Sequence, residues 1–236
     1  MAVADPVEQG SACPDRRCDG SGWILDEDDT ALPCSCRDGR ISRAKTRHMG
    51  SGVPRRFLRE ASFERKPVCD LDTIVLRDTR GFIAQIEANI ADGRGRWFYG
   101  DVGTGKTLLA MLISKAALAS GRSVAVYSVP RLLAEIKETY EAGSGMSYMQ
   151  LFGRLCNVDL LHLDDLGAER RTEWVLEQLY SIVNERWQDQ RSIVVTTNLG
   201  LDELREQVGW RTVSRLVEIC GDPIPIMGRD LRIVTT

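Results

Sequence analysis

The sequence predicts an α/β fold in which a parallel β-sheet is covered by helices on both faces. A glycine-rich motif that binds phosphate lies between a short apolar strand and an apolar helix. Downstream of this motif, near-continuous apolar strands alternate with helices, which is the order of a parallel sheet. Two of these strands end in polar side chains, at the edge where sheets of this class place their chemistry.

The amino-acid composition limits the classes of protein to which this chain can belong. The 236 residues are 43% hydrophobic and 28% charged, with a formal net charge of −3. This is ordinary for a globular domain with a small appendage, and it excludes collagen-like, mucin-like and fully disordered chains. The longest apolar runs are far shorter than the ~20 residues of a membrane helix, and the first ten residues include no apolar stretch. We therefore expect a cytoplasmic protein without a membrane segment.

Charge is distributed unevenly at the start of the chain. Residues 1–36 carry two basic and eight acidic side chains, for a net charge of −6. Residues 37–66 carry ten basic and three acidic side chains, for a net charge of +7. This reversal indicates neighbouring segments with different partners. The basic segment is either a solvated linker or a surface that contacts a phosphate backbone or an acidic partner.

Four of the seven cysteines lie within the first 36 residues, in the pattern Cys-x4-Cys followed by Cys-x-Cys. Without a secretion signal, a metal site is favoured over a disulfide framework. Four thiolates can close a tetrahedron around Zn²⁺, which would supply much of the folding free energy of a segment with so few apolar residues. The alternative is a disordered tail with incidental thiols. The predicted zinc ligands are Cys13, Cys18, Cys34 and Cys36.

The phosphate motif spans residues 100–107 and reads Gly-Asp-Val-Gly-Thr-Gly-Lys-Thr, which matches every fixed position of G-x-x-x-x-G-K-[ST]. Its glycines let backbone N–H groups curl around a phosphate at the N-terminus of the following helix. Lys106 would reach the β- and γ-phosphates, and the Thr107 hydroxyl would hold Mg²⁺. The predicted nucleotide-binding residues are Gly100, Asp101, Val102, Gly103, Thr104, Gly105, Lys106, Thr107 and Leu108, with Asp164 further along the chain.

Strands and helices alternate around and after this motif. Hydrophobic pattern and helix-start signals define their limits. We predict strands at residues 96–99, 123–129, 158–165 and 192–198, helices at 108–119, 130–140 and 172–190, and a Gly/Ser-rich loop at 141–147.

Polar residues end two of the predicted strands beside the phosphate loop. Asp164 would bind Mg²⁺ directly or through water, and Asp165 would orient and polarise the attacking water. Asn198, with Thr196 and Thr197, would hydrogen-bond the γ-phosphate or the water. The structural alternatives are a helix cap for the two aspartates and a strand-terminating turn for the asparagine.

These motifs, together with the tryptophan-bounded stretch 174–187, resemble AAA+ ATPases of the DnaC/DnaI helicase-loader and IstB group. The resemblance covers roughly residue 52 to the C-terminus, and the cysteine segment looks like the module that precedes some loader ATPases. It implies a three-layer AAA+ P-loop fold that binds ATP. The lid must be vestigial because only 38 residues follow Asn198. The implied division is a zinc-binding module at 1–40, a basic linker at 41–70 and an AAA+ ATPase domain with a short lid at 71–236.

The resemblance also assigns roles to arginines near the C-terminus. Arg215, in a Ser-Arg-Leu setting, matches the residue that one subunit places against the γ-phosphate held by its neighbour. Arg211 lies one helical turn earlier and is its partner or replacement. Arg232, favoured over Arg229, resembles the sensor 2 arginine that acts within its own subunit. A fixed guanidinium would neutralise the charge that spreads over the transferring phosphoryl group. The alternative for each arginine is a surface ion pair.

The function implied by the resemblance is that of an ATP-dependent loader. It would bind the replicative DNA helicase, help to deposit it on single-stranded DNA during replication initiation, and form a homo-oligomer through ATP-bridged interfaces. Arg131, Lys137 and Tyr140 would contact the single strand, unless their helix is an ordinary amphipathic one. The first alternative function is an IstB-type transposition helper that binds DNA and a transposase. The others are a small-molecule kinase and a nucleotide switch with negligible hydrolysis, since Asp165 stands where many related ATPases have Glu.

Overall fold

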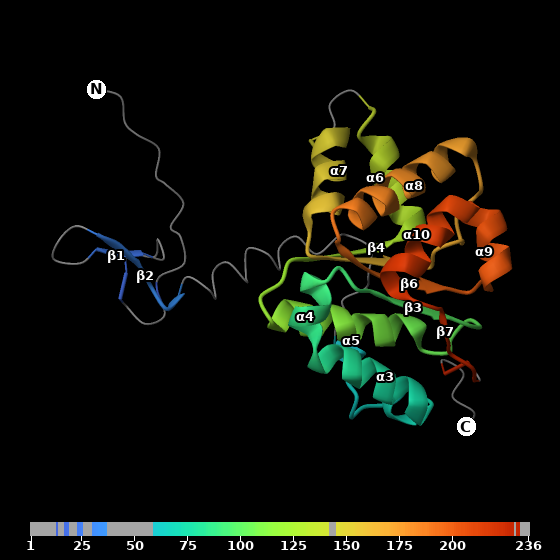
Figure 1. The fold of residues 1–236 in the computed structure, drawn as a ribbon, viewed down its shortest axis with the longest axis horizontal. Coiled ribbons are helices and arrows are strands. Elements are labelled where there is room, and N and C mark those ends of the chain that lie inside the picture. Colours follow the sequence, from blue (N-terminus) through green and yellow to red (C-terminus); the bar gives the residue numbers. More distant parts are fainter. Residues whose placement is uncertain are drawn as a thin grey trace. The chain divides into compact units, whose positions relative to one another are not determined.

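The computed structural model describes residues 13, 17–18, 23–25, 30–36, 59–141, 145–228 and 230–231. The chain divides into two compact units, Met1–Arg47 and His48–Thr236 (Figure 1). In the part of the chain that is described, no helix has both the length and the apolar character that a membrane crossing requires.

The first unit contains a short antiparallel hairpin of β1 (Trp23–Leu25) and β2 (Ala31–Pro33), in which Ile24 pairs with Leu32. Cysteines form its core. Cys13, Cys34 and Cys36 are buried, and Cys18 and Ile24 pack against them. Sulfur atoms therefore occupy the position that aliphatic side chains take in a larger domain.

The second unit is built on a five-stranded parallel sheet with the strand order β4-β5-β6-β3-β7. Its strands are β3 (Arg96–Tyr99), β4 (Val124–Ser128), β5 (Leu160–Asp164), β6 (Ser192–Thr197) and β7 (Ile224–Pro225). All four neighbouring pairs are parallel, and β6 lies between β5 and β3. The parallel sheet and the four strands predicted from the sequence are confirmed.

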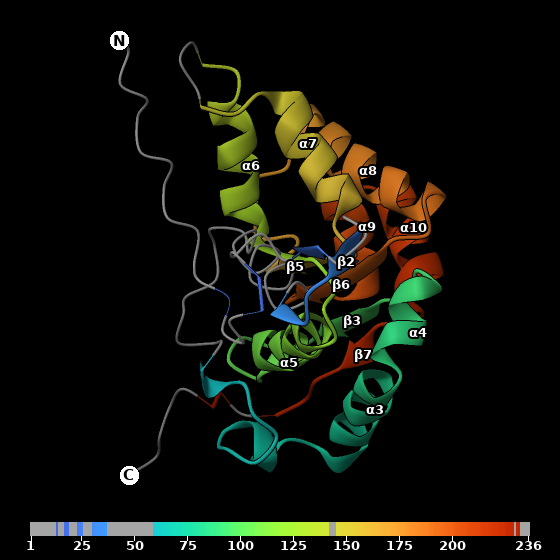
Figure 2. The ribbon, with the colours of Figure 1, turned by 90° about the vertical axis from the view of Figure 1, so that its left-hand side faces the viewer.

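Helices cover both faces of this sheet, as predicted (Figures 1 and 2). One face carries α3 (Thr73–Ala84), α4 (Ile86–Ala91) and α5 (Lys106–Ala119). The other carries α6 (Val129–Glu138), α7 (Tyr148–Asn157), α8 (Glu173–Gln188), α9 (Leu201–Val208) and α10 (Trp210–Cys220). Strand β4 shows the pattern: Val124 and Val126 pack with the α5 layer, whereas Ala125 and Tyr127 pack with the opposite layer.

Two regions differ from the sequence prediction. No helix or strand was predicted for residues 148–157, where the structure has α7. This helix begins at a reciprocal capping box between Ser147 and Gln150, a signal that the Gly/Ser-rich context obscured. Part of the predicted linker belongs to the core, because Ala61 and Val68 are fully buried in the α5 layer and the 3-10 helix η1 (Val68–Asp70) precedes α3. The packed unit therefore begins before residue 71.

The chain after Asn198 forms no separate helical lid within the described residues. Helix α10 packs on α8 and the sheet, where Val213 and Leu216 are fully buried. Strand β7 then adds to the sheet beside β3. This C-terminal segment therefore contributes to the core.

A buried arginine joins α7, α8 and the sheet. Arg186 of α8 is fully buried and donates hydrogen bonds to five backbone carbonyls, those of Leu155, Cys156, Val158, Asp159 and Ser192, at 2.6–3.3 Å. Burial lowers the pKa of Arg186 to about 9, so the guanidinium remains protonated at neutral pH. It satisfies the carbonyls that α7 leaves unpaired at its C-terminal end.

Replacing Arg186 with Met should therefore destabilise the second unit by about 3 kcal/mol or more, because several buried carbonyls lose their donors. Arg191→Met is the matched control, since Arg191 is 38% exposed and its Nη1 lies 3.6 Å from Asp159 Oδ1. The control should lose no more than about 1 kcal/mol. Urea unfolding followed by tryptophan fluorescence measures both values, and equal losses would contradict this role of Arg186.

Candidate functional site

The phosphate motif forms the turn between β3 and α5. Gly103 and Gly105 adopt positive φ angles of 80° and 99°. A Cβ at Gly103 would overlap the Asp230 carboxylate, and one at Gly105 would lie 3.2 Å from the Leu71 side chain. The positive φ angles therefore favour glycine at both positions, and a side chain at either position would also require its neighbour to shift. The turn leads directly into α5, whose N-terminal amides and dipole favour an anion.

Lys106 begins α5 and is buried against the loop. Its Nζ donates hydrogen bonds to the carbonyl oxygens of Gly100, at 2.8 Å, and Asp101, at 2.6 Å. The Thr104 hydroxyl donates to the same Asp101 carbonyl at 2.9 Å. The ammonium group thus lies inside the curve of the loop, where the motif predicts a phosphate contact.

Asp164 ends β5 and is almost completely buried. The Thr196 hydroxyl donates a hydrogen bond of 2.7 Å to its Oδ1, and His162 Nε2 lies 3.8 Å from the same oxygen. The Thr107 hydroxyl also lowers the pKa of this carboxylate. Burial opposes the charged form, but the His162 imidazole and these two hydroxyls outweigh it. Together they hold the pKa of Asp164 below its usual value.

Thr107 and Asp164 fit the predicted magnesium site. A hydroxyl and a carboxylate are oxygen ligands of the kind that Mg²⁺ prefers, and the Thr107 hydroxyl is close enough to the Asp164 carboxylate to lower its pKa. Thr107 lies in the first turn of α5 and Asp164 lies at the end of β5, so the fold brings the predicted pair together.

The predicted strand-end residues separate into two groups. Asp165 and Asn198 line the cavity next to the phosphate loop. The Thr196 and Thr197 hydroxyls are buried and have protein partners: Thr196 bonds to Asp164 and the Asp165 amide, and Thr197 bonds to Leu166 O and the Leu199 amide. The expectation that both threonines meet the γ-phosphate is therefore not supported, and Asn198 is the residue of this trio that faces the cavity.

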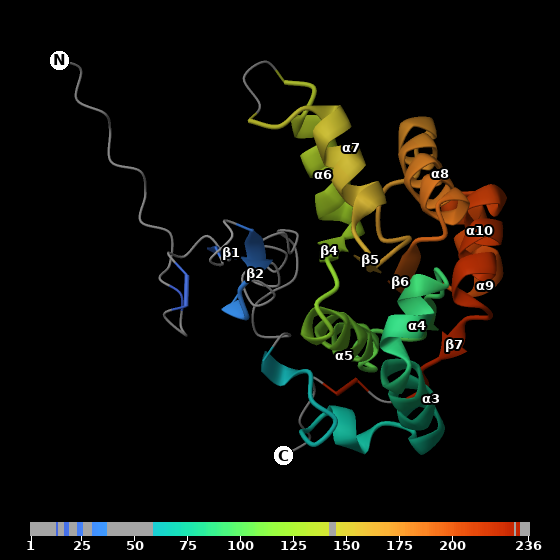
Figure 3. The same ribbon diagram turned by 60° about the vertical axis from the view of Figure 1, so that its left-hand side comes forward.

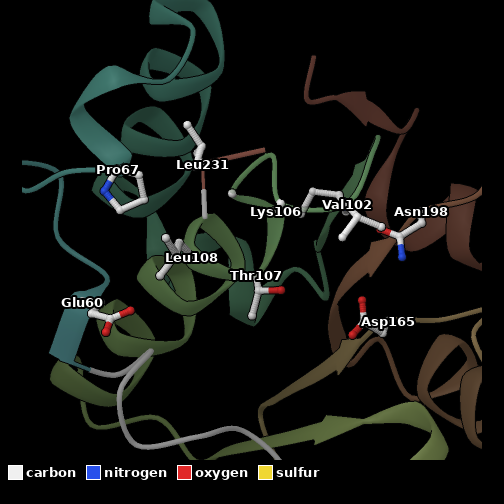
Figure 4. Close-up of a pocket in the computed structure, with 11 residues that line it drawn as sticks. Glu60, Pro67, Val102, Lys106, Thr107, Leu108, Asp165, Asn198 and Leu231 are labelled. Atoms are coloured by element: carbon white, nitrogen blue, oxygen red, sulfur yellow. The ribbon is translucent and has the colours of Figure 1, made fainter. Parts of the chain in front are cut away.

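The cavity has a volume of about 310 Å³ and is lined by both polar and apolar side chains (Figure 4). Asp165 and Asn198 lie on one side of it, with Val102 beside Asn198. Pro67, Leu231 and the Glu60 carboxylate lie on the opposite side. A cavity of this size, with a few polar groups among apolar ones, suits a small-molecule ligand such as a nucleotide.

Three of the lining residues on the side opposite Asp165 and Asn198 were not predicted. Glu60 and Pro67 fall in the segment assigned to the linker, and Leu231 lies in the sensor 2-like segment, where only the neighbouring arginines were given a role. No local pattern connects these three positions, because only the folded chain brings them to one cavity.

The four predicted zinc ligands meet in the first unit, where their Sγ atoms all lie within 4.8 Å of one another. Cys13 Sγ is 3.8 Å from Cys34 Sγ, and Cys18 Sγ is 3.5 Å from Cys36 Sγ. Zn–S bonds of about 2.3 Å in a tetrahedron place sulfur pairs about 3.8 Å apart. The cluster therefore has suitable spacing for a single Zn²⁺ despite the wide Cys-x4-Cys pair.

The predicted arginines of α10 lie outside this cavity. Arg215 contacts other residues of its own chain: its Nη1 is 2.7 Å from Glu218 Oε1, and its guanidinium carbon is 3.5 Å from the centroid of the Trp187 ring. Arg211 is exposed beside Trp210, whose side chain is 68% exposed. Arg229 and Arg232 lie outside the described residues.

Comparisons with known proteins agree with this geometry. The family described as IstB-like ATP binding protein matches residues 36–217. The replicative helicase loader DnaC of Escherichia coli K12 is 30% identical over 181 residues, which cover 76% of this chain and 72% of that protein. The resemblance drawn from the sequence motifs is confirmed.

Solved structures show the same fold. A crystal structure of the DnaC helicase loader aligns with a TM-score of 0.58 at 27% identity, covering 64% of this chain and 88% of that one. The crystal structure of DnaI aligns with a TM-score of 0.60 over 80% of this chain and 99% of that one. At 22% identity, the DnaI likeness shows the fold alone. The predicted AAA+ fold class is thereby confirmed.

Replacing Lys106 with Ala should weaken ATP binding about 100-fold, because the charged hydrogen bonds to phosphate oxygens are lost. The domain should stay folded, since the freed carbonyls lie in a loop that borders a cavity. Lys137→Ala, on α6, is the control and should bind ATP as the natural protein does. Titration with a fluorescent ATP analogue, paired with thermal unfolding, measures both properties. Tight binding by Lys106→Ala would contradict the loop assignment.

Elemental analysis of the purified chain should find about one zinc per molecule, because four clustered thiols provide a complete ligand set. Cys34→Ser should lose the metal and the folding free energy that it contributes. Cys69→Ser is the matched control, since Cys69 is exposed in the second unit and lies outside the cluster. A natural protein without metal, or equal loss in both variants, would refute the site.

Proposed function

Because this chain belongs to the family of IstB-like ATP binding proteins, we propose that it is an ATP-hydrolysing loader of a replicative DNA helicase. The supporting observation is its 30% identity to a replicative helicase loader over 76% of its length, a span that accounts for most of the second unit. The loader would use ATP to control its grip on the helicase and to place the helicase on single-stranded DNA.

Hydrolysis would take place at the edge of the sheet between the phosphate loop and β5. Bound Mg²⁺ would neutralise charge on the phosphate oxygens, and Thr107 and Asp164 would hold it. Lys106 would contact the β- and γ-phosphates. Asp165 would orient the attacking water and Asn198 would contact the γ-phosphate or that water, since both face the cavity. Asp165 is one methylene shorter than Glu, which favours slow turnover.

A homo-oligomer with ATP at each junction would complete this site. Arg211 and Arg215 lie on α10, and neither lines the cavity of its own subunit. We infer that Arg215, by the resemblance, meets the γ-phosphate held by a neighbour, and that Arg211 supports or replaces it. Arg232 would act within its own subunit. Contact with the neighbour would release Arg215 from Glu218 and Trp187.

The α6–α7 region would contact single-stranded DNA. These helices stand side by side (Figure 3), and Tyr140, Tyr148 and Phe152 stack in succession with ring centroids 5.7 Å apart. Tyr140, at the end of this stack, is 57% exposed. Exposed aromatic rings stack on bases of any sequence, and cations such as Arg131 and Lys137 favour the phosphate backbone.

The first unit would engage the helicase. We propose a zinc-binding module at residues 1–40, with Cys13, Cys18, Cys34 and Cys36 as ligands, followed by a basic segment that contacts the same partner. The second unit, with its core from residue 61 onward, would be the ATPase domain.

The loading activity is tested with the replicative helicase of the native host and a circular single strand. The chain and ATP together should increase the helicase bound to the circle at least about tenfold, and Lys106→Ala should not. Gel filtration followed by immunodetection measures the bound helicase.

An IstB-type transposition helper is the alternative, because the matching family is described as IstB-like ATP binding protein. Affinity capture from native extract, with and without ATP, separates the two functions. Recovery of the replicative helicase supports the loader, whereas recovery of a transposase without the helicase, or failure to load, would refute it.

A further inference from the structure

Thr196 makes hydrogen bonds to both aspartates of the candidate site. It lies on β6, the strand between β5 and β3, and is fully buried. Its hydroxyl donates a 2.7 Å hydrogen bond to Asp164 Oδ1 and accepts a 3.0 Å bond from the Asp165 amide. Because a hydroxyl has one proton, this proton is committed to Asp164. One side chain therefore contacts both neighbouring aspartates.

The backbone of Asp165 has an uncommon conformation, which the hydrogen bond from its amide to Thr196 helps to hold. Asp165 has a φ of 56°, in the left-handed region that residues other than glycine seldom adopt. Strand β6 holds this conformation at two consecutive amides, since the Thr196 hydroxyl accepts from Asp165 N and the Thr196 carbonyl accepts from Leu166 N at 2.9 Å. Strained conformations persist where the surrounding structure over-determines them, and they are frequent at functional sites. With this conformation, the Asp165 side chain points into the cavity (Figure 4).

We propose that Thr196 is a positioning residue that sets the geometry of both carboxylates through its single hydroxyl. By binding Oδ1, it would leave Asp164 Oδ2 directed at the metal, and by holding the Asp165 amide it would direct that carboxylate at the attacking water. This inference rests on the proposed ATP hydrolysis and is independent of the helicase partner. Loss of a side chain that hydrogen-bonds to a metal ligand typically lowers metal affinity or activity 10- to 100-fold.

Thr197 offers a matched control on the same strand. It is as fully buried as Thr196, and its hydroxyl also makes two hydrogen bonds, to Leu166 O at 2.6 Å and from the Leu199 amide at 3.1 Å. Both partners are backbone groups and neither is a carboxylate. Thr196→Val and Thr197→Val therefore remove the same chemical group at the same depth, and only the first should change the carboxylates.

The first measurement is the Mg²⁺ concentration that gives half-maximal binding of a fluorescent ATP analogue. Thr196→Val should raise it about tenfold while leaving binding in EDTA within about twofold of the natural protein. Thr196→Ser, which keeps the hydroxyl, should restore it to within about threefold. Thr197→Val should behave as the natural protein does, even if its thermal midpoint falls as much as that of Thr196→Val.

The second measurement is steady-state hydrolysis at saturating Mg²⁺. Thr196→Val should lower kcat about tenfold with little change in KM, because Asp165 loses its orientation after ATP is already bound. Unchanged Mg²⁺ dependence in Thr196→Val, or the same change in Thr197→Val, would overturn the proposal. If only helicase loading fails, the loader function is refuted and the positioning role of Thr196 is not. The Mg²⁺ dependence of ATP binding tests that role even if the protein hydrolyses ATP negligibly.

Discussion

The order of three parallel strands is the constraint on which the candidate site depends. Strand β6 pairs with β5 on one side and β3 on the other, so the carboxyl ends of all three strands lie at one edge of the sheet. The phosphate loop follows β3, Asp164 ends β5 and Asp165 follows it, and Asn198 follows β6. Parallel strands need long crossover connections, which explains how residues far apart in sequence meet at this edge. A nucleotide that spans the loop would therefore be in reach of groups from three strands.

Buried polar groups align neighbouring elements at both ends of the sheet. At the carboxyl edge, Thr196 joins β6 to the end of β5. At the opposite edge, Arg186 joins α8 to the end of α7, to the segment that precedes β5 and to the first residue of β6. Each is fully buried, so its hydrogen bonds are made in a medium of low dielectric where an unpaired partner would be costly. The apolar layers on the two faces of the sheet drive folding, whereas these polar contacts specify how neighbouring elements align. The geometry of Asp164 is thus part of the sheet, and not a property of an exposed loop.

The two units of the chain are stabilised by different physical effects. The second unit has two extensive apolar layers, which account for its fold without any ligand. The described part of the first unit has three buried cysteines and one adjacent isoleucine in place of such a core. Its stability would depend on a metal, since so little apolar surface is removed from water. Nucleotide binding would therefore affect the second unit, and zinc binding would affect the first.

Motifs with a fixed local spacing were predictable from the sequence. Residues 100–107 revealed the phosphate loop because its chemistry needs those glycines, lysine and threonine in one turn. Apolar strands ending in Asp164 and Asn198 revealed the sheet edge, and four close-set cysteines indicated the cluster. Three features have no local pattern and were known only from the folded structure. They are the cavity residues opposite Asp165 and Asn198, the buried hydrogen bonds of Arg186, and the hydrogen bonds of the Thr196 hydroxyl to the two aspartates. In each case the contact joins residues separated along the chain. Packing between elements selects a side chain's partners, and no short stretch of sequence contains that information.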